Sequence, residues 1–344
     1  MSIKDKTLEF LEKNRGRYIS GAELARELDV SRNAIWKSIK SLQSEGYNIS
    51  AVTNKGYSLS EDTDILSAQS VSKYIKSTNY FKIKVYKTIE STNDKVKELA
   101  LDGKEEGYIV ISEEQTKGKG RFGRKFHSPK NTGIYMSILL RPRLMAQDSY
   151  LITTSAAVAV AEAIESISNK EAKIKWVNDI YLDDKKVSGI LTEAALDFES
   201  GLIQYVVLGI GVNLKSPNEG FHEDIKNIAA SVFNEEDNLP KDTRSLFIAK
   251  IIENFFSYYN SIDQKKFIDE YKRKSILINR EVNIESNKGS VKAKVLEIDD
   301  LCRLKVQLED GSIKELSSGE VSIRMKEWKI KEWKNENLKL VLSL

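Results

Sequence analysis

The stretch from residue 118 to residue 126 reads Gly118-Lys119-Gly120-Arg121-Phe122-Gly123-Arg124-Lys125-Phe126, with three glycines and four cations in nine residues. Strand-like runs flank it at 108–112 and 133–140, so we expect a loop. Glycine permits positive φ and close backbone approach, so this loop can direct N–H groups and cationic side chains at a polyanion. It fits neither the Walker nor the dinucleotide fingerprint. The pattern predicts a phosphate-binding loop, and a solvated basic hairpin tip stays open as the alternative.

A second segment reads Lys175-Trp176-Val177-Asn178-Asp179-Ile180-Tyr181-Leu182 and continues through Asp183-Asp184-Lys185 to Lys186. Its apolar residues alternate as in two strands joined by a tight turn. Asp179 offers a carboxylate to a hard cation such as Mg²⁺, and Lys186 offers a point charge to an anionic substrate. The segment therefore predicts a hairpin that carries charge-handling residues.

Together the two segments resemble the catalytic core of the biotin protein ligases. Gly118 to Arg124 match the family's glycine/arginine loop, Lys175 to Asp179 match its Lys-Trp-Pro-Asn-Asp signature, and Lys186 matches its biotin-side lysine. Further matches are Glu90-Ser91-Thr92-Asn93, Gln115, and Gly209-Ile210-Gly211-Val212-Asn213-Leu214. The combination is highly specific, because it joins several separated motifs.

Three positions depart from the family pattern. Val177 stands at the proline of the signature, which we expect to loosen that turn, and Phe126 stands where the family usually has tryptophan. Lys119 replaces the arginine of the first Gly-Arg-Gly, with little loss expected because the family often uses backbone groups there.

Composition sets outer bounds on the protein. A chain of 344 residues predicts two or three domains, and 40% hydrophobic with 31% charged residues is ordinary for a globular protein. We find neither an apolar run of membrane-spanning length nor a signal-peptide core, which predicts a cytoplasmic protein. One cysteine, Cys302, and two histidines exclude an internal disulfide and disfavour a zinc centre. Cys302 lies in a strand-like run, where packing is its expected role.

Residues 1–62 are predicted to form a winged helix-turn-helix DNA-binding domain. A first helix is expected at Thr7 to Lys13, a capping-box pattern at Ser20 to Glu23 opens a second, and Ser31 caps a third that ends at Gly46. A hairpin wing with Lys55 at its tip follows. Arg and Asn suit base edges and Lys suits phosphates, so the DNA-binding candidates are Ser31, Arg32, Asn33, Trp36, Lys37, Lys40 and Lys55. A dimerisation or docking module with a solvated polar face is the alternative, because a net charge of +3 does not by itself indicate nucleic-acid binding.

Residues 67–274 are expected to form the catalytic domain, an α/β domain of the biotin/lipoate ligase type. The runs predict a mixed or largely antiparallel sheet with helices on one face, so the overall fold class is α+β multidomain. Residues 277–324 show short strands with turns at Asn287 to Gly289, Asp299-Asp300 and Asp310-Gly311. They resemble the family's SH3-like C-terminal barrel, with 319–324 as its closing segment. No role is predicted for the tail, residues 325–344.

The resemblance implies a two-step reaction. The carboxylate of biotin attacks the α-phosphate of ATP to give biotinyl-5′-adenylate, and a lysine of biotin carboxyl carrier protein (of acetyl-CoA carboxylase or another biotin-dependent carboxylase) then attacks the mixed anhydride. Charge neutralisation and positioning are needed rather than a protein nucleophile. The implied catalytic residues are Arg121, Lys186 and Asp179, and Asp179 is also implied to bind Mg²⁺ through ATP.

The resemblance also assigns binding residues. The biotin candidates are Ser91, Thr92, Asn93, Gln115, Lys119, Gly120, Arg121 and Lys186, and the ATP or adenylate candidates are Arg121, Arg124, Asn178, Asp179, Trp176 and Asn213. Two simpler interpretations stay open: Ser91 or Thr92 serves only as a helix cap, and Trp176 belongs to the core rather than flanking the pocket.

The chain looks most like the two-function members, in which the adenylate is also the corepressor of biotin genes and drives homodimerisation on an operator. The alternatives are a lipoate ligase, a ligase without working DNA binding, and a non-catalytic biotin-sensing repressor.

Overall fold

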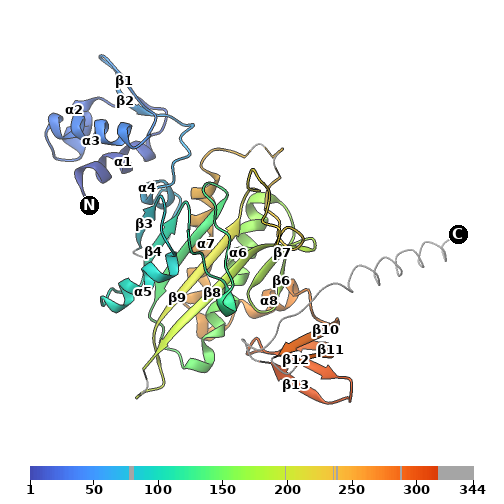
Figure 1. Ribbon diagram of the computed structural model, residues 1–344. Coiled ribbons are helices and arrows are strands. Elements are labelled where there is room, and N and C mark those ends of the chain that lie inside the picture. Colours follow the sequence, from blue (N-terminus) through green and yellow to red (C-terminus); the bar gives the residue numbers. More distant parts are fainter. Residues whose placement is uncertain (77–80, 198, 235, 238, 287–288, 317–344) are drawn as a thin grey trace.

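The structure is a computed structural model that describes residues 1–76, 81–197, 199–234, 236–237, 239–286 and 289–316. Its N-terminal part holds helices α1 (Ile3–Lys13), α2 (Gly21–Glu27) and α3 (Arg32–Ser44), then the hairpin of β1 (Ile49–Val52) and β2 (Gly56–Leu59) (Figure 1). The order of three helices and a hairpin is as predicted. The first helix begins four residues before the predicted start, because Ser2 and Asp5 form a capping box there.

The cap of α2 is only half of the predicted box. Ser20 Oγ accepts from Glu23 N at 3.0 Å, whereas the Glu23 carboxylate pairs with Arg17 instead of returning to the cap backbone. Ser31 caps α3 as predicted, accepting from Ala34 N at 3.2 Å. These caps satisfy backbone donors that the first helical turn leaves without partners.

A seven-stranded sheet forms the centre of the molecule, in the order β3-β4-β5-β9-β8-β7-β6. Only β3 and β4 run parallel, and every other neighbouring pair is antiparallel, so the predicted mixed sheet is confirmed. The strands are β3 (Lys82–Tyr86), β4 (Tyr108–Ser112), β5 (Gly133–Leu140), β6 (Ala172–Lys175), β7 (Asp179–Leu182), β8 (Lys185–Leu196) and β9 (Ile203–Asn213).

Helices cover both faces of this sheet, so the expectation of helices on one face is wrong. Ile109 and Ile111 of β4 join the main core with α6 (Tyr150–Ser168) and α7 (Thr243–Tyr259), while Val110 packs with α5 (Thr92–Leu101) in a separate cluster. Successive strand residues point to opposite faces, so a strand that is apolar throughout is buried on both sides. The short α4 (Ala68–Ser72) and α8 (Ile268–Lys274) complete this part.

One helical stretch, Ala146–Ser168, is long and apolar enough to cross a membrane by length and composition alone, contrary to the sequence-based expectation. Two thirds of it is buried inside the protein. It is the central core helix, packed between the sheet and α7 (Figure 1).

The C-terminal part is a four-stranded antiparallel sheet of β10 (Glu281–Ser286), β11 (Gly289–Ile298), β12 (Leu304–Leu308) and β13 (Ile313–Leu316). The described residues form an open sheet, and the expected closing segment 319–324 and the tail lie outside them. Cys302 lies in the turn before β12 with φ 53°, not in a strand as expected, although it is buried and free. Burial raises the pKa of its thiol to about 11, consistent with a packing role.

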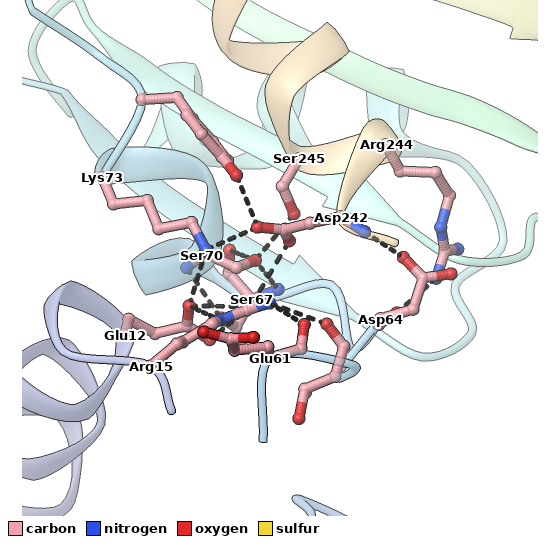
Figure 2. Close-up of polar contacts among 12 residues, drawn as sticks. Glu12, Arg15, Glu61, Asp64, Ser67, Ser70, Lys73, Asp242, Arg244 and Ser245 are labelled. Atoms are coloured by element: carbon pink, nitrogen blue, oxygen red, sulfur yellow. Dashed lines mark hydrogen bonds and ion pairs between the residues drawn. The ribbon is translucent and has the colours of Figure 1, made fainter. Parts of the chain in front are cut away.

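An ion-pair network, which we call the junction, joins the N-terminal helices to the central domain (Figure 2). Glu12 of α1 accepts from Arg15 at 2.7 Å and from Lys73 at 3.0 Å. Asp242, just before α7, contacts the same two cations at 3.4 and 2.5 Å and accepts from the Tyr74 hydroxyl at 2.8 Å. Burial, followed by the bond to Asp242, raises the pKa of Tyr74 to about 12. The junction therefore contains two cations and two carboxylates that neutralise one another.

Candidate functional site

A pocket with about 310 Å³ of empty space lies on the sheet beside the start of α5. Glycines form its floor: Gly189 of β8 pairs directly with Gly211 of β9, and Gly209 lies two residues away. A Cβ at Gly211 would come within 2.5 Å of the Phe126 ring. The absence of side chains at these glycines lets the Phe126 ring, which lies edge-on to Tyr135 at 6.3 Å, pack directly on Gly211 and form one wall of the pocket.

The polar end of the pocket comes from the first turn of α5. Ser91 is the N-cap, with Oγ 3.4 Å from Asp94 N, so its capping role is confirmed, and it also lines the pocket. Thr92 donates its N–H to Gln115 Oε1 at 2.8 Å, and Gln115 Nε2 donates to Ser128 Oγ at 2.9 Å. These hydrogen bonds therefore hold the start of α5 against the residues that flank the cationic loop, at the rim of the pocket.

The cationic loop folds back on itself as a small flap between Gly118 and Phe126. Gly120 N donates to Arg124 O at 2.7 Å and Phe126 N donates to Gly118 O at 2.9 Å. Phe122 and Gly123 adopt left-handed φ values of 56° and 72°, which turn the flap. Lys119 lines the pocket and bonds to Asp94 of α5, while Arg124 is exposed.

Arg121 points from the flap to the second motif. Its Nη1 donates to Asn178 Oδ1 at 3.0 Å, and Asn178 Nδ2 donates to Ile190 O at 2.9 Å and to Asp179 Oδ1 at 3.0 Å. Asp179 Oδ1 also lies 2.6 Å from Lys186 Nζ. The two sequence motifs therefore meet in space, next to the glycine floor.

Val177 does not leave the turn of the signature loose. Its carbonyl accepts from the buried Tyr271 hydroxyl at 3.0 Å, and Ile190 N donates to Asn178 O at 3.0 Å. The side chain itself is 2% exposed. The turn is held from both sides, contrary to the expectation.

The electrostatics of the site are dominated by cations around a single carboxylate. Burial lowers the pKa of Lys175, and its neighbours Lys186 and Arg124 add to the lowering, while Asp179 opposes it. Burial likewise lowers the pKa of Arg121, again opposed by Asp179. Half-buried cations gathered near Asp179 suit an anionic ligand.

A magnesium ion fits this donor set only in a limited way. Among the described residues, no group of three or more His, Cys, Asp or Glu side chains could hold a metal. Asp179 supplies one carboxylate, already bonded to Lys186 and Asn178. Mg²⁺ is commonly held by one or two carboxylates together with substrate phosphates, so Asp179 fits a phosphate-borne ion rather than a protein cage.

The expected DNA-reading residues form an exposed surface on α3 and the β1–β2 hairpin. All of the following are exposed: Ser31, Arg32, Asn33, Trp36, Lys37, Lys40 and Lys55. Ile35, Ile39 and Leu42 on the other side of α3 are buried in the N-terminal core. Trp36 is half exposed, which is unusual for a tryptophan with only a packing role.

Comparisons with known proteins agree with this architecture. Residues 85–213 match the Biotin/lipoate A/B protein ligase family, residues 4–58 an HTH domain, and residues 277–324 the Biotin protein ligase C terminal domain. The bifunctional ligase/repressor BirA of Bacillus spizizenii is 31% identical over 94% of this chain and 99% of its own length. This chain belongs to the family of bifunctional biotin protein ligases and repressors.

Other family members give the same result. The bifunctional ligase/repressor BirA of Escherichia coli is 27% identical over 91% of this chain and 95% of its own length. A biotin protein ligase from Aquifex aeolicus, solved in complex with biotin and ATP, aligns with a TM-score of 0.58 and 28% identity. The alignment covers 72% of this chain and 100% of the Aquifex aeolicus chain. The family's ligase part and its DNA-binding part are therefore both present here.

Not every residue expected at the site reaches the pocket. Ser91, Thr92, Asn93, Gln115 and Lys119 line it, and Arg121, Asn178, Asp179 and Lys186 lie around the neighbouring ion pair. Trp176 is buried with the core, and its Nε1 donates to Cys302 O at 2.8 Å, so its contacts favour the core alternative over a pocket-flanking role.

Asn213 has a backbone partner of its own. Its Nδ2 donates to Ala230 O at 3.1 Å, while Ala230 N donates to Lys186 O at 2.9 Å. Sequence reasoning missed three further residues near the site, Ser137, Glu193 and Lys175. Ser137 and Glu193 belong to no sequence motif. Their place near the site becomes visible only in the structure, where β5, β8 and α5 come together.

Proposed function

We propose that this chain is an ATP-dependent ligase that activates biotin as biotinyl-5′-adenylate and transfers it to a lysine of biotin carboxyl carrier protein. The observation that carries the proposal is the meeting of the cationic flap with the Asp179–Lys186 pair beside a glycine-floored pocket. Two relatives of this chain are named as bifunctional ligase/repressors. The active-site residues follow from this arrangement.

The first step joins two anions, a carboxylate and a triphosphate. Arg121 and Lys186 reduce their repulsion, and Lys175 adds positive charge behind them. Lys186 lies on β8, three residues before Gly189, and a Cβ at Gly189 would come within 3.1 Å of its Nζ, so Lys186 is within reach of the carboxylate end of a ligand beside this strand. Fixed charges that need no rearrangement stabilise developing charge well, which makes a covalent enzyme intermediate unnecessary.

The pocket suits the ring end of biotin. The bicycle is proposed to lie beside the Phe126 ring that covers Gly211, where the polar groups of Ser91, Thr92 and Gln115 match a buried ureido edge. Lys119 of the flap also lines this pocket, whereas Gly120, expected to bind biotin, is not among its lining residues. A lipoate ligase is the second candidate within the family description, but lipoate's dithiolane has no donors or acceptors to pair with this polar end.

Asp179 is the residue that would hold Mg²⁺ through the phosphates of ATP, and the ion would neutralise charge on the triphosphate. Arg124 and Asn178 are proposed to bind the nucleotide at this side. Asn213 supports the segment 228–230 that pairs with Lys186, so its proposed part in adenylate binding is indirect.

The flap is proposed to keep water from the adenylate until the carrier lysine arrives. A glycine-rich segment with two residues at left-handed φ is suited to move and to close on an anion. The carrier lysine then attacks the mixed anhydride, and AMP leaves.

The exposed α3 surface supports a repressor function with the adenylate as corepressor. Arg32 and Asn33 near the start of the helix suit base edges, and Lys37, Lys40 and Lys55 suit phosphates. We propose a homodimer of adenylate-bound chains that places two such helices on operator half-sites. The domain bounds 1–62, 67–274 and 277–324, an SH3-like closure of the last domain, and a cytoplasmic location belong to the same proposal.

ATP–pyrophosphate exchange dependent on biotin tests the ligase function. We expect exchange with biotin and none with lipoate, and the reverse would identify a lipoate ligase. A gel-shift titration of the biotin-operon promoter with and without the adenylate tests the repressor function. Exchange without any adenylate-dependent shift would leave a ligase whose N-terminal domain does not read DNA, and a shift without exchange would leave a sensor.

A further inference from the structure

A short segment, residues 60–66, connects the N-terminal domain to the central domain and forms neither helix nor strand. Without further contacts, such a connection would act as a hinge. Here an arginine from each domain holds it (Figure 2). Arg15, just after α1, donates from Nη1 to Thr63 O at 2.9 Å. Arg244 of α7 donates from Nη2 to Asp64 O at 3.0 Å. The connection is therefore fixed to both of the domains that it joins.

The junction ties the same two domains together through side chains. Lys73 Nζ of α4 lies 3.0 Å from Glu12 Oε2 of α1, so this pair crosses from the central domain to the N-terminal domain. Arg15 Nη2 lies 3.4 Å from Asp242 Oδ1 and crosses in the opposite direction. These four side chains are 0 to 13% exposed. Salt screens buried pairs much less than surface pairs, so these contacts should persist at the ionic strength at which a protein binds DNA.

The junction also fixes the position of the exposed helix α3. Leu8 and Leu11 of α1, the helix that carries Glu12, share one buried core with Ile35 and Ile39 of α3. A packed core of this kind moves as a unit. The N-terminal helices lie beyond one end of the sheet, and α4 is the element of the central domain nearest to them (Figure 1). The orientation of α3 relative to the central domain is therefore set where α1 meets α4 and the start of α7.

We propose that the junction mounts the N-terminal domain rigidly, so that the adenylate-bound homodimer selects operators by the spacing of their two half-sites. This inference rests on the proposed repressor function and adds what the repressor measures on the DNA. One base pair changes the half-site separation by about 3.4 Å and turns one half-site by about 34° around the DNA axis. A rigidly mounted pair of α3 helices cannot follow that change, whereas a pair on free hinges can.

Lys73→Met tests the proposal in the full-length chain. The operators carry the half-sites footprinted on the biotin-operon promoter, with spacers shortened or lengthened by one or two base pairs, and a gel-shift titration with the adenylate measures each affinity. For the parent we expect a loss of about tenfold or more for each base pair. The variant should bind the best operator about fivefold more weakly, because its N-terminal domain must now be ordered on binding. Its loss for each base pair should shrink to about threefold or less, with biotin-dependent exchange unchanged.

A second variant approaches the junction from the other domain. Arg15→Gln removes the contacts to Thr63 and Asp242 and should flatten the spacing dependence in the same way. Arg15 also pairs with Glu12 inside the N-terminal domain, so Lys73→Met, which leaves that pair intact, keeps the test valid if Arg15→Gln does not fold.

Two matched controls change ion pairs that lie within the N-terminal domain. Lys4→Met breaks the pair with Glu45, and Arg17→Gln breaks the pair with Glu23. Neither pair reaches the central domain, so both controls should keep the steep spacing dependence of the parent. A spacing dependence as flat in these controls as in Lys73→Met would overturn the proposal.

A measurement without DNA tests the mounting directly. Cys302 is buried, so spin labels can be attached to cysteines introduced at two exposed positions, Ser44→Cys on α3 and Lys97→Cys on α5. Electron paramagnetic resonance should give one narrow distance distribution for the labelled parent and a broader one after Lys73→Met. A broad distribution in the parent would overturn the proposal.

The gel-shift series can overturn it as well. A parent that binds every spacing equally, or variants whose affinity falls by the same factor on every spacing, would show that the junction does not set the spacing. Failure of the proposed repressor function would look different, because the parent would then show no adenylate-dependent shift on any operator.

Discussion

The junction and the active-site cluster are both built from buried charges, but they are balanced differently. At the junction, Arg15 and Lys73 each contact both Glu12 and Asp242, and the side chains are 0 to 13% exposed. At the site, Arg121 and Lys175 are half-buried near Asp179, which already pairs with Lys186. Charges that pair with one another stabilise the fold. Cations that outnumber the nearby carboxylates can instead bind an anionic ligand.

The contrast explains why the same side chains have different roles in the two places. A neutral network gains nothing from an incoming anion, and removing one member leaves a buried charge without a partner. The cations of a cation-rich cluster gain their full set of partners only when an anion binds. Removing one of these cations should therefore weaken ligand binding more than it lowers folding stability. The predictions below test this contrast, with the largest expected effect first.

Glu12→Ala should lower the free energy of unfolding by about 3 to 5 kcal/mol, because Arg15 and Lys73 lose one of their two buried carboxylates. Urea denaturation of the N-terminal part, followed by Trp36 fluorescence, measures the change. Glu9→Ala on the same helix breaks an exposed pair with Lys13 and should cost less than about 1 kcal/mol. Equal effects of the two variants would show that the junction is no stronger than a surface pair.

Lys186→Ala should lower kcat/KM for biotin-dependent exchange about 10²- to 10³-fold, as the loss of one preorganised charge does in other enzymes. Its melting temperature should fall less than that of Glu12→Ala, because Asp179 loses one partner at a partly exposed site but keeps its bond from Asn178. Lys185→Ala changes the exposed neighbour and should keep full activity. A large drop in stability with little loss of exchange would place Lys186 with the structural charges instead.

Arg121→Gly should release the adenylate about tenfold faster or more, since the bond from the flap to Asn178 is lost together with a cation. A filter assay of retained radiolabelled adenylate, with carrier proteins of differing sequence as acceptors, measures release and relaxed acceptor choice. Lys125→Gly introduces the same flexibility and charge loss on the exposed side of the flap and serves as control. Adenylate retained as tightly as in the parent would count against this role.

The pH dependence of ATP binding should reflect Lys175. Burial lowers its pKa, so the ammonium loses its proton at a lower pH than an exposed lysine does, and the KM for ATP should rise on the alkaline side. Lys175→Arg keeps its charge and should move that alkaline limb to higher pH. Lys173→Arg, on the same strand and paired with Glu171, should leave the limb in place. An unchanged profile in Lys175→Arg would remove Lys175 from the phosphate site.

The sequence by itself determined the local elements and the chemistry of each motif. Ser31 predicts the cap of α3, and the turn at Asp183 predicts the β7–β8 hairpin. The composition of the flap predicts that it binds an anion. Caps, tight turns and glycine loops depend on residues that are neighbours in the sequence. A stretch of a few residues is therefore enough to predict them. The resemblance of the motifs to those of the family indicated which anions to expect, the carboxylate of biotin and the phosphates of ATP.

Only the tertiary structure decided which charges pair with one another and which polar side chains from distant segments meet. Glu12 and Asp242 are 230 residues apart, and Ser137 and Glu193 belong to no motif, yet each pair acts through one shared set of partners. The same limit explains the errors over Cys302 and the second helical layer, and it explains why the sequence left the position of Trp176 open. Burial and the balance of charge depend on contacts between distant segments, and a one-dimensional pattern does not contain them.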